Sequence, residues 1–438
     1  MSMANNNVPS DKIFFPGLDG LRFIAAALVI VNHVENRRNQ FDISNFLHIN
    51  FFSTVGYYGV TLFFVLSGFL ITYLILKEVE KYGKVNIRHF YIRRALRIWP
   101  LYFFIILTGL FLWSKIPMMH IPLYGAWWDK VDWRVFMLYA FFLPQFAQVY
   151  FDSIPYIDQT WSVGVEEQFY LVWPILISLW CKNILRVLVL VIFIMLLLKT
   201  GALYFHELKH RGEHILLLIN LSRFGCMATG GIAAYAYFKN KEYFLRFVLR
   251  KDVFIMTLIF TAALLGWGFS NLLVASFLAI IGFQAFLYAR SEKLNGWKWY
   301  AVFPAAFVVI WVFAYAGHFN YPVFDRYANE LIALPFAAII LNISAKSGQF
   351  SALEHPIMQY LGRISYGVYM YHNIMITLSV RLLLATYPAL ESIFGHIVLY
   401  GIAFGLTIGC SALSYELLEK PFLQMKKRFA KVHSGANG

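Results

Sequence analysis

Residues 21–33 read Leu21-Arg22-Phe23-Ile24-Ala25-Ala26-Ala27-Leu28-Val29-Ile30-Val31-Asn32-His33, an apolar run with an arginine near one end and a histidine at the other. On a helix that rises about 1.5 Å per residue, the two ionisable side chains lie roughly 16 Å apart along the axis. Such side chains are expensive to keep inside lipid, so they usually serve a function or have a partner. The run predicts a membrane helix with one ionisable group near a membrane face and the other deep inside.

The composition of the whole chain is typical of a membrane protein. Of its 438 residues, 60% are hydrophobic and only 14% are charged. A soluble fold of this length could not bury so much apolar surface. The aromatic share of 19% suits lipid-facing and interfacial positions. We therefore expect an all-α, polytopic integral membrane protein whose first partner is the lipid bilayer.

Twelve apolar runs reach or approach the length that spans a bilayer. They cover residues 18–34, 56–76, 98–113, 161–180, 184–199, 216–238, 253–268, 271–289, 299–316, 329–344, 366–384 and 394–414. We expect about 10–12 transmembrane helices from them. A further apolar piece at 134–146 is expected to dip into the bilayer or to lie on it without crossing.

Lysines and arginines collect at 77–97, at 239–252 and in the tail. The positive-inside rule places these segments, and with them both termini, in the cytoplasm, and leaves 114–160 outside. We divide the chain into a cytoplasmic segment 1–17, a membrane domain 18–425 and a basic cytoplasmic tail 426–438. The net charge of +14 is explained by these loops and anionic lipid headgroups, so nucleic acid is not expected as a partner.

Two arginines, Arg94 and Arg97, stand one helical turn apart where the basic segment enters the third apolar run. They project from one helix face and could clamp a phosphate, or they could be ordinary anchors that reach to lipid headgroups. Arg22 lies at the same cytoplasmic end, which favours one anion site built from two helices.

His33 lies on the helix of Arg22 but closer to the outer leaflet. It is either a core histidine with a satisfied hydrogen bond or a general base. A ligand with a phosphate-rich head and a flexible arm would reach from the arginines to His33. Acyl-coenzyme A has this shape.

Two adjacent carboxylates, Glu166 and Glu167, enter the fourth apolar run, and helical spacing points them to different sides. One could stabilise the helix N-terminus, with Thr160 or Ser162 as the N-cap. The other would then be free to orient His33 or to bind an acceptor hydroxyl.

These motifs together resemble acyltransferase family 3, the integral-membrane O-acyltransferases of bacterial cell-surface polysaccharides. The matches run in family order from residue 18 to about 425: Leu18-Asp19-Gly20-Leu21-Arg22 with His33, Phe63-Phe64-Val65-Leu66-Ser67-Gly68-Phe69-Leu70-Ile71, Arg93-Arg94 with Arg97-Ile98 and Pro100, Thr160-Trp161-Ser162 through Glu166-Glu167-Gln168-Phe169-Tyr170, Ser365-Tyr366 with Tyr369 and His372, and Glu419-Lys420-Pro421-Phe422.

The resemblance implies a role for each matching position. His33 would be the catalytic histidine, with Glu166 and Glu167 as the acidic pair of the catalytic site. Arg22, Arg94, Arg97 and Asp19 would bind the donor, usually acetyl-coenzyme A, and a sugar hydroxyl would be the acceptor. Trp161, Tyr170 and His372 are further substrate-binding candidates. No metal is implied, and the protein would reside in a bacterial plasma membrane.

Two features depart from the family pattern. Tyr371-His372-Asn373 stands where the family usually has Trp-His followed closely by Pro. The twelve candidate spans also exceed the ten usually assigned to the domain. Some short runs within 253–316 would then be re-entrant or form an added hairpin.

A zinc-protease pattern, H-E-x-x-H, occurs at His206-Glu207-Leu208-Lys209-His210. In that pattern two histidines bind zinc and the glutamate serves as general base. Here it lies in a polar outer connection, and no third ligand follows at the extended spacing. A solvated charged loop is favoured over a metalloprotease.

The outer segment 114–160 is rich in aromatic residues and carboxylates. They are Tyr124, Trp127, Trp128, Trp133, Tyr139, Tyr150 and Tyr156, with Asp129, Asp132, Asp152 and Asp158. This composition fits a saccharide platform and an interfacial aromatic belt equally well.

We therefore expect a membrane enzyme that transfers an acyl group, most simply acetyl, from acyl-coenzyme A to a hydroxyl of a cell-surface carbohydrate. The main alternative is a transporter or flippase of a lipid-linked sugar, in which the buried charges would line a pathway.

Overall fold

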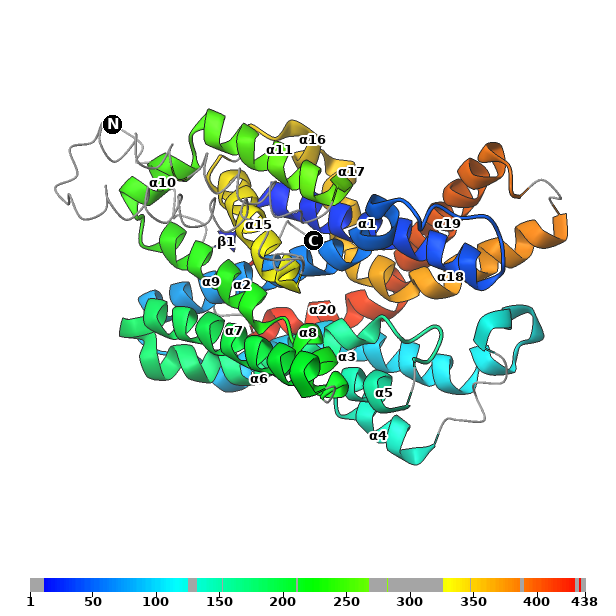
Figure 1. The fold of residues 1–438 in the computed structure, drawn as a ribbon. Helices are drawn as coiled ribbons and strands as arrows, with labels where there is room; N and C mark the ends of the chain where they lie inside the picture. The colour runs from blue at the N-terminus through cyan, green and yellow to red at the C-terminus, as the bar shows by residue number, and fades with distance from the viewer. Residues whose placement is uncertain are drawn as a thin grey trace, which may run out of the picture.

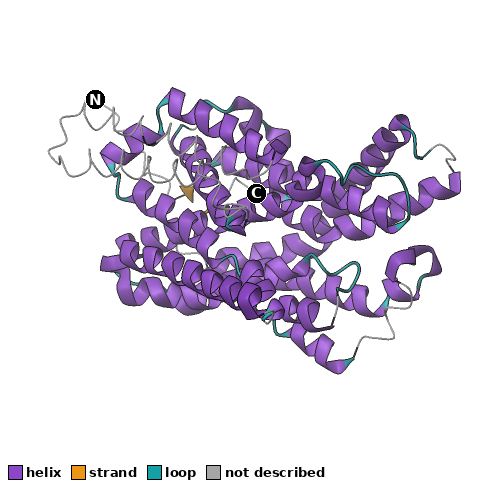
Figure 2. Ribbon diagram, viewed as in Figure 1, coloured by secondary structure: helices purple, strands orange, loops and turns teal. Residues whose placement is uncertain are grey.

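The computed structural model describes residues 12–124, 132–151, 153–209, 212–267, 282, 326–346, 348–386, 390–429 and 433–434. In these residues, eight helical stretches are long and apolar enough to cross a membrane. The predicted all-α, polytopic class is confirmed, and Figure 2 shows that helices make up most of the described chain. Each predicted span in the described part of the chain is helical. The runs 271–289 and 299–316 fall, apart from residue 282, outside the described residues.

The long helices follow one another along the chain and are coloured in that order in Figure 1. They are α1 (Pro16–Gln40), α2 (Asn50–Tyr82), α3 (Ile87–Phe111), α6 (Thr160–Trp180), α7 (Ile184–Lys209), α9 (Phe224–Phe238), α11 (Lys251–Trp267), α15 (Ala328–Ala345), α18 (Ser365–Thr386) and α19 (Ile393–Ser414). Shorter helices are α4 (Trp133–Ala140), α5 (Pro144–Phe151), α8 (Glu213–Leu221), α10 (Glu242–Val248), α16 (Ser351–Glu354), α17 (Pro356–Arg363) and α20 (Lys420–Lys426).

The remaining elements are short. They are the 3-10 turns η1 (Trp113–Lys115), η2 (Pro117–Met119), η3 (Pro122–Tyr124), η5 (Cys181–Asn183) and η7 (Lys427–Phe429), the π-helix η6 (Tyr415–Glu419), and the strands β1 (Lys12–Ile13) and β2 (His433–Ser434). The two strands pair in parallel and bring the described ends of the chain together.

Helices α2 and α3 extend well beyond their apolar runs into the basic segment predicted as a loop. Helix α2 continues to Tyr82 and ends at Gly83, whose φ of 71° is the left-handed conformation that glycine adopts easily. Asn86 caps α3 by accepting a hydrogen bond from the His89 amide. Lysine and arginine are good helix formers, so the helices continue past the apolar stretch. The connection between them is only residues 83–86.

The outer segment 114–160 contains short elements only in its described part. Helices α4 and α5 have eight residues each, about 12 Å of helix, against a hydrocarbon core of about 30 Å. Phe142, at φ 59°, turns the chain between them. This agrees with the expectation that residues 134–146 do not cross the membrane.

Helix α1 lies at the centre of the packing. It contacts α2 and α18 along its length, and its N-terminal end packs on α16 and α17. Helix α2 in turn contacts α9 and α15, and α3 contacts α6, α18 and α20 (Figure 1). Residues from α1, α2, α3, α6, α18 and α20 thereby surround a common interior.

Candidate active site

A cavity of about 190 Å³ lies between α1, α2, α3, α6, α18 and α20. We call it the arginine cavity, because its charged lining residues are Asp19, Arg22, Arg94, Arg97, Glu166 and Lys426. Four cations face two carboxylates, so the cavity favours an anionic ligand. The structure thus brings together the three arginines that the sequence assigned to the donor phosphates, with Asp19 among them.

Arg22 and Arg94 are held in different ways. Arg22 forms an ion pair with Asp19 one turn earlier on α1, with Nη1 2.5 Å from Oδ1. The guanidinium carbon of Arg94 lies 5.4 Å from the ring centre of Tyr170 and 5.6 Å from that of Phe90. Its Nε has no hydrogen-bond partner among the described residues. Arg94 is therefore positioned by ring contacts, and its Nε donor is not used by a described residue.

Glu166 lies on the wall of the arginine cavity. Its carboxylate is next to the hydroxyls of Ser67 and Tyr170, and these two hydroxyls are 2.5 Å apart. Ser67 comes from α2, and Tyr170 stands one turn after Glu166 on α6. Tyr170, a substrate-binding candidate, thus lines the same cavity as the three arginines.

A second cavity of about 220 Å³ contains His33, and we call it the histidine cavity. Its lining is Asn32, His33, Asn36, Arg37, Gln40, Gly56, Tyr57, Val60, Gln148, Ser153, Asp158, Gln159, Trp161 and Tyr369. Val60 and Tyr369 also line the arginine cavity. The two cavities therefore meet at these side chains, and α1 carries Arg22 in one and His33 in the other.

His372 is in direct contact with His33. The ring centres are 4.7 Å apart and the planes are 83° from parallel. Nδ1 of His372 lies 2.5 Å from the backbone oxygen of Tyr369. In a neutral ring Nδ1 therefore carries the proton, and Nε2 is an acceptor. This Nε2 is buried without a hydrogen-bond partner in the described part of the chain.

An amide network fixes the start of α6 against α18 beside His33. The Asn373 side chain donates to Asp158 Oδ1 at 2.6 Å and to Gln159 Oε1 at 2.9 Å. Gln159 donates in turn to the backbone oxygen of Met370 at 2.8 Å. Asn373 belongs to the Tyr371-His372-Asn373 stretch that departs from the family pattern. In this structure its side chain connects α18 to the start of α6.

The expected N-cap of α6 is wrong. Gln159 occupies this position, while Thr160 and Ser162 are the first and third residues of the helix. Their hydroxyls donate to the backbone oxygens of Ile157 and Gln159, three residues earlier in each case. The helix begins earlier than predicted because the preceding residues already adopt turn geometry.

The two adjacent glutamates point in different directions, as predicted. Glu166 faces the arginine cavity, and it does not line the histidine cavity. Glu167 instead accepts a hydrogen bond from the indole of Trp99 at 3.2 Å. Neither glutamate stabilises the N-terminus of α6, because both lie near the second turn of this helix. Trp161, on the same helix, lines the histidine cavity.

The aromatic residues of segment 114–160 do not form one exposed platform in its described part. Tyr139 and Tyr156 are buried, whereas Trp133 is 74% exposed. Burial raises the pKa of Tyr156 to about 12, so its hydroxyl stays protonated and donates to the backbone oxygen of Met119. Asp158 is the member of the set that lines the histidine cavity. Trp127, Trp128, Asp129 and Asp152 lie outside the described residues.

The H-E-x-x-H pattern lies at the end of α7 and is only partly described. His206 belongs to this helix, and His210 lies outside the described residues. Neither cavity is lined by His206. No group of three metal-ligating side chains occurs within the described ranges.

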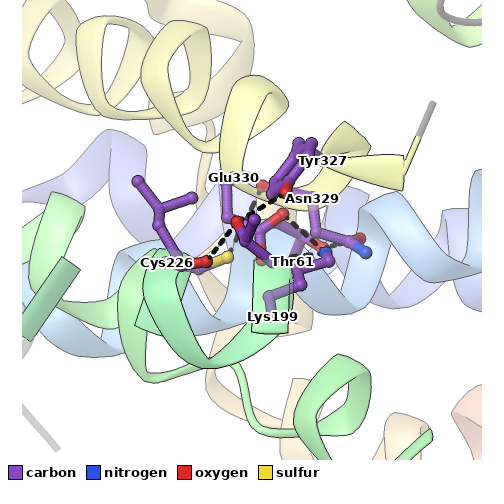
Figure 3. Close-up of polar contacts among 8 residues, drawn as sticks. Thr61, Lys199, Cys226, Tyr327, Asn329 and Glu330 are labelled. Carbon is purple, nitrogen blue, oxygen red and sulfur yellow. Dashed lines mark hydrogen bonds and ion pairs between the residues drawn. The ribbon is translucent and has the colours of Figure 1, made fainter. Parts of the chain in front are cut away.

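A separate buried cluster joins α2, α7, α9 and α15 (Figure 3). Lys199 and Glu330 form an ion pair at 2.9 Å, and Thr61 donates to the Asn329 side chain at 3.1 Å. Cys226 contacts the backbone oxygen of Asn329 at 3.5 Å. Because charges and hydroxyls are paired within it, we assign this cluster to helix packing.

Several lining residues were not singled out from the sequence. Arg37 could have been predicted from the sequence as a neighbour of His33, because it follows His33 by one helical turn. Lys426 was assigned to the basic tail, but α20 folds it against the arginine cavity. Asp158 and Gln159 line the cavity that contains His33 only because the start of α6 packs against α18. The sequence gives no local signal for such a contact.

A family model and several known proteins match the chain. A family model described as an acyltransferase domain matches residues 15–266 and 243–416. The peptidoglycan O-acetyltransferase OatA of Listeria monocytogenes is 34% identical over 179 residues, which are 39% of this chain and 26% of that protein. The O-acetyltransferase OatA of Staphylococcus aureus is 30% identical over 170 residues, 38% of this chain and 25% of that protein. The match thus spans about a quarter of each relative. No solved structure matches the chain.

Proposed function

The chain belongs to acyltransferase family 3, and on this premise we propose that it transfers an acetyl group from cytoplasmic acetyl-coenzyme A to a hydroxyl of a cell-surface carbohydrate. The observation that carries the proposal is that two adjacent cavities share Val60 and Tyr369 in their linings. One cavity is cationic, and the other contains a histidine. A donor with an anionic head and a reactive thioester at the end of a long arm fits this arrangement.

In the proposed reaction, Arg22, Arg94 and Arg97 hold the donor phosphates by charge-assisted hydrogen bonds. The arm passes Val60 and Tyr369, and the thioester carbonyl reaches His33. His33 accepts the proton of the acceptor hydroxyl while the hydroxyl oxygen attacks the carbonyl carbon. The carbon–sulfur bond then breaks, and the thiolate takes up a proton and leaves as free coenzyme A. A covalent acyl-histidine relay would use the same residues.

The orientation in the membrane is part of the proposal. The basic ends of α2 and α3 and the basic residues near Lys239 and Lys426 favour a cytoplasmic position for these ends and for both termini. The arginine cavity then opens to the side where acetyl-coenzyme A is made, and the histidine cavity lies nearer the outside. We keep 18–425 as the membrane acyltransferase domain, with a cytoplasmic segment 1–17 and a basic tail 426–438.

The peptidoglycan named in the Listeria relative is one carbohydrate of the proposed class. The polar lining of the histidine cavity supports a hydroxyl-rich acceptor, because five of its residues, Asn32, Asn36, Gln40, Gln148 and Gln159, carry side-chain amides. Amides donate and accept hydrogen bonds as sugars do. Trp161 and Tyr57 add ring faces on which a sugar can stack.

The central test compares the wild type with His33→Ala. Membranes of producing cells are supplied with acetyl-coenzyme A, release of free thiol is followed, and the surface glycans are examined by mass spectrometry. We expect His33→Ala to abolish both thiol release and glycan acetylation at an unchanged protein level. His48→Ala, at an exposed histidine outside both cavities, should retain activity. Normal acetylation by His33→Ala would disprove the assignment, and glycan export without thiol release would indicate a flippase.

A further inference from the structure

Arg37 is a buried cation in the histidine cavity that none of the proposed steps uses. It follows His33 by four residues on α1, so both side chains lie on one helix face. Its side chain is among the cavity lining, and the residue is only 4% exposed. A guanidinium at such a place is costly unless it is neutralised.

The contacts of Arg37 include no ion pair in the described structure. Nη2 donates to the Asn373 side chain at a long 3.5 Å, and the guanidinium carbon lies 5.9 Å from the ring centre of Tyr156. Nη1 has no hydrogen-bond partner, and no ion pair to a described carboxylate is formed. Arg37 is thus oriented by weak contacts, and its Nη1 donor is unused among the described residues.

The nearby carboxylate, Asp158, is engaged elsewhere. It lines the same cavity, but its Oδ1 accepts hydrogen bonds from the Asn373 side chain at 2.6 Å and from the Gln159 amide at 2.9 Å. The described lining of the histidine cavity therefore contains one carboxylate and one guanidinium that form no ion pair with each other.

The neighbouring Arg38 shows what a structural arginine looks like at this helix end. It is fully buried, donates from Nε to the Ser44 backbone oxygen at 2.7 Å and from Nη2 to that of Leu390 at 3.2 Å. Its Nη1, like that of Arg37, has no partner among the described residues. It ties two loops to α1 and does not line the cavity. Either arginine suits the C-terminal dipole of α1, but only Arg37 faces the space beside His33.

We propose that Arg37 binds an anionic group of the acceptor, so that the acceptor is an acidic sugar. A guanidinium pairs with a carboxylate or a phosphate through two parallel hydrogen bonds, which fixes both position and orientation. Held in this way one helical turn from His33, the sugar presents a neighbouring hydroxyl to the imidazole. This inference rests on the proposed function, because it names the class of acceptor for the same site.

The test measures sugar binding without the acyl donor. Purified protein in lipid nanodiscs is titrated by calorimetry with methyl glucuronoside and with methyl glucoside, which differ in one carboxylate. Glucose 6-phosphate and glucose form the matched phosphate pair. The variants are Arg37→Gln, Arg37→Lys and the control Arg134→Gln, which removes an exposed arginine on α4.

We expect the wild type and Arg134→Gln to bind one acidic sugar about tenfold or more tighter than its neutral counterpart, as for a charge-assisted hydrogen bond. The acidic sugar that is preferred identifies the anion as a carboxylate or a phosphate. Arg37→Gln should lose the preference while still binding the neutral sugar, and Arg37→Lys should keep part of it.

The inference is overturned if the wild type binds neither acidic sugar more tightly than its neutral partner, or if Arg37→Gln keeps the preference. An equal loss of both sugars in Arg37→Gln also overturns it, because that indicates a structural or oxyanion role. The His33→Ala comparison separates this failure from that of the proposed function. If acetyl transfer still depends on His33, only the acidic acceptor is rejected.

Discussion

The imidazole of His372 meets that of His33 edge to face, with 4.7 Å between the ring centres. The two histidines come from α18 and α1, which are more than 300 residues apart in the sequence. His372 is completely buried and is anchored through Nδ1 to its own helix. The imidazole of His33, the proposed base, is therefore in contact with a second imidazole whose position is fixed.

We predict that His372→Phe lowers kcat about ten- to hundredfold with a smaller effect on the donor KM. Phenylalanine keeps an aromatic edge against His33 but removes both nitrogens, so it tests hydrogen bonding apart from packing. Steady-state thiol release in proteoliposomes measures both constants. Wild-type kcat in this variant would mean that His372 contributes packing only.

The acidic pair should separate into one functional and one peripheral residue. Glu166→Gln alters the group beside Ser67 and Tyr170 in the arginine cavity, so we expect kcat/KM to fall about tenfold or more. Glu167→Gln can still accept the Trp99 indole hydrogen bond, and its effect should stay within about threefold. The two isosteric variants control for each other when compared at equal protein level. Equal losses would contradict this division of roles.

If the arginine cavity binds the donor phosphates, as we propose, the effect of its variants should depend on the donor. Arg94→Gln, Arg97→Gln and Lys426→Gln should each raise the KM for acetyl-coenzyme A about tenfold, because each loses a charge-assisted hydrogen bond. Acetylated pantetheine keeps the thioester and lacks every phosphate. With this donor the wild type and the three variants should have similar KM values. A rise in KM with both donors would instead indicate a general distortion of the cavity.

Much of the fold could be predicted from the sequence because lipid imposes a local rule: a spanning segment must be apolar and helical. Every predicted span in the described part of the chain is helical, although 216–238 is divided into α8 and α9 at Ser222 and Arg223. The predicted positions of the helix ends were less accurate. Helices α2 and α3 continue through the basic residues, since hydropathy marks the apolar part of a helix and not its hydrogen-bonded length.

The candidate site was predictable where it is carried on one helix. Arg22 and His33 lie on α1, and the spacing of Arg94 and Arg97 shows their common face. The assignment of Glu166 to the arginine side required the packing of α6 against α2 and α3. Lys426 and Asp158 enter the cavities through contacts between segments that are distant in sequence. No periodic pattern in one segment contains that information.

The stability of the site depends on close contact between α2 and α9 at two glycines. A Cβ atom added to Gly68 would lie 1.9 Å from the backbone oxygen of Met227, and one added to Gly230 would lie 2.0 Å from that of Val65. Backbone atoms cannot move aside as a flexible side chain can. Small residues allow such close approach between membrane helices, and Gly68 follows Ser67 in the arginine cavity.

We predict that Gly68→Ala and Gly230→Ala each destabilise the protein by about 1–3 kcal/mol, the cost of overpacking a tight contact. Gly401 on α19 is the matched control, because no described atom beyond its chain neighbours and its own helix backbone lies within 4 Å of a Cβ placed there. Gly401→Ala should be neutral or slightly stabilising, since alanine favours a helix. Thermal unfolding of the purified variants in detergent measures the effect. Unchanged melting of Gly68→Ala and Gly230→Ala would show that α2 and α9 are not packed this closely, and the position of Ser67 beside Tyr170 would then need another explanation.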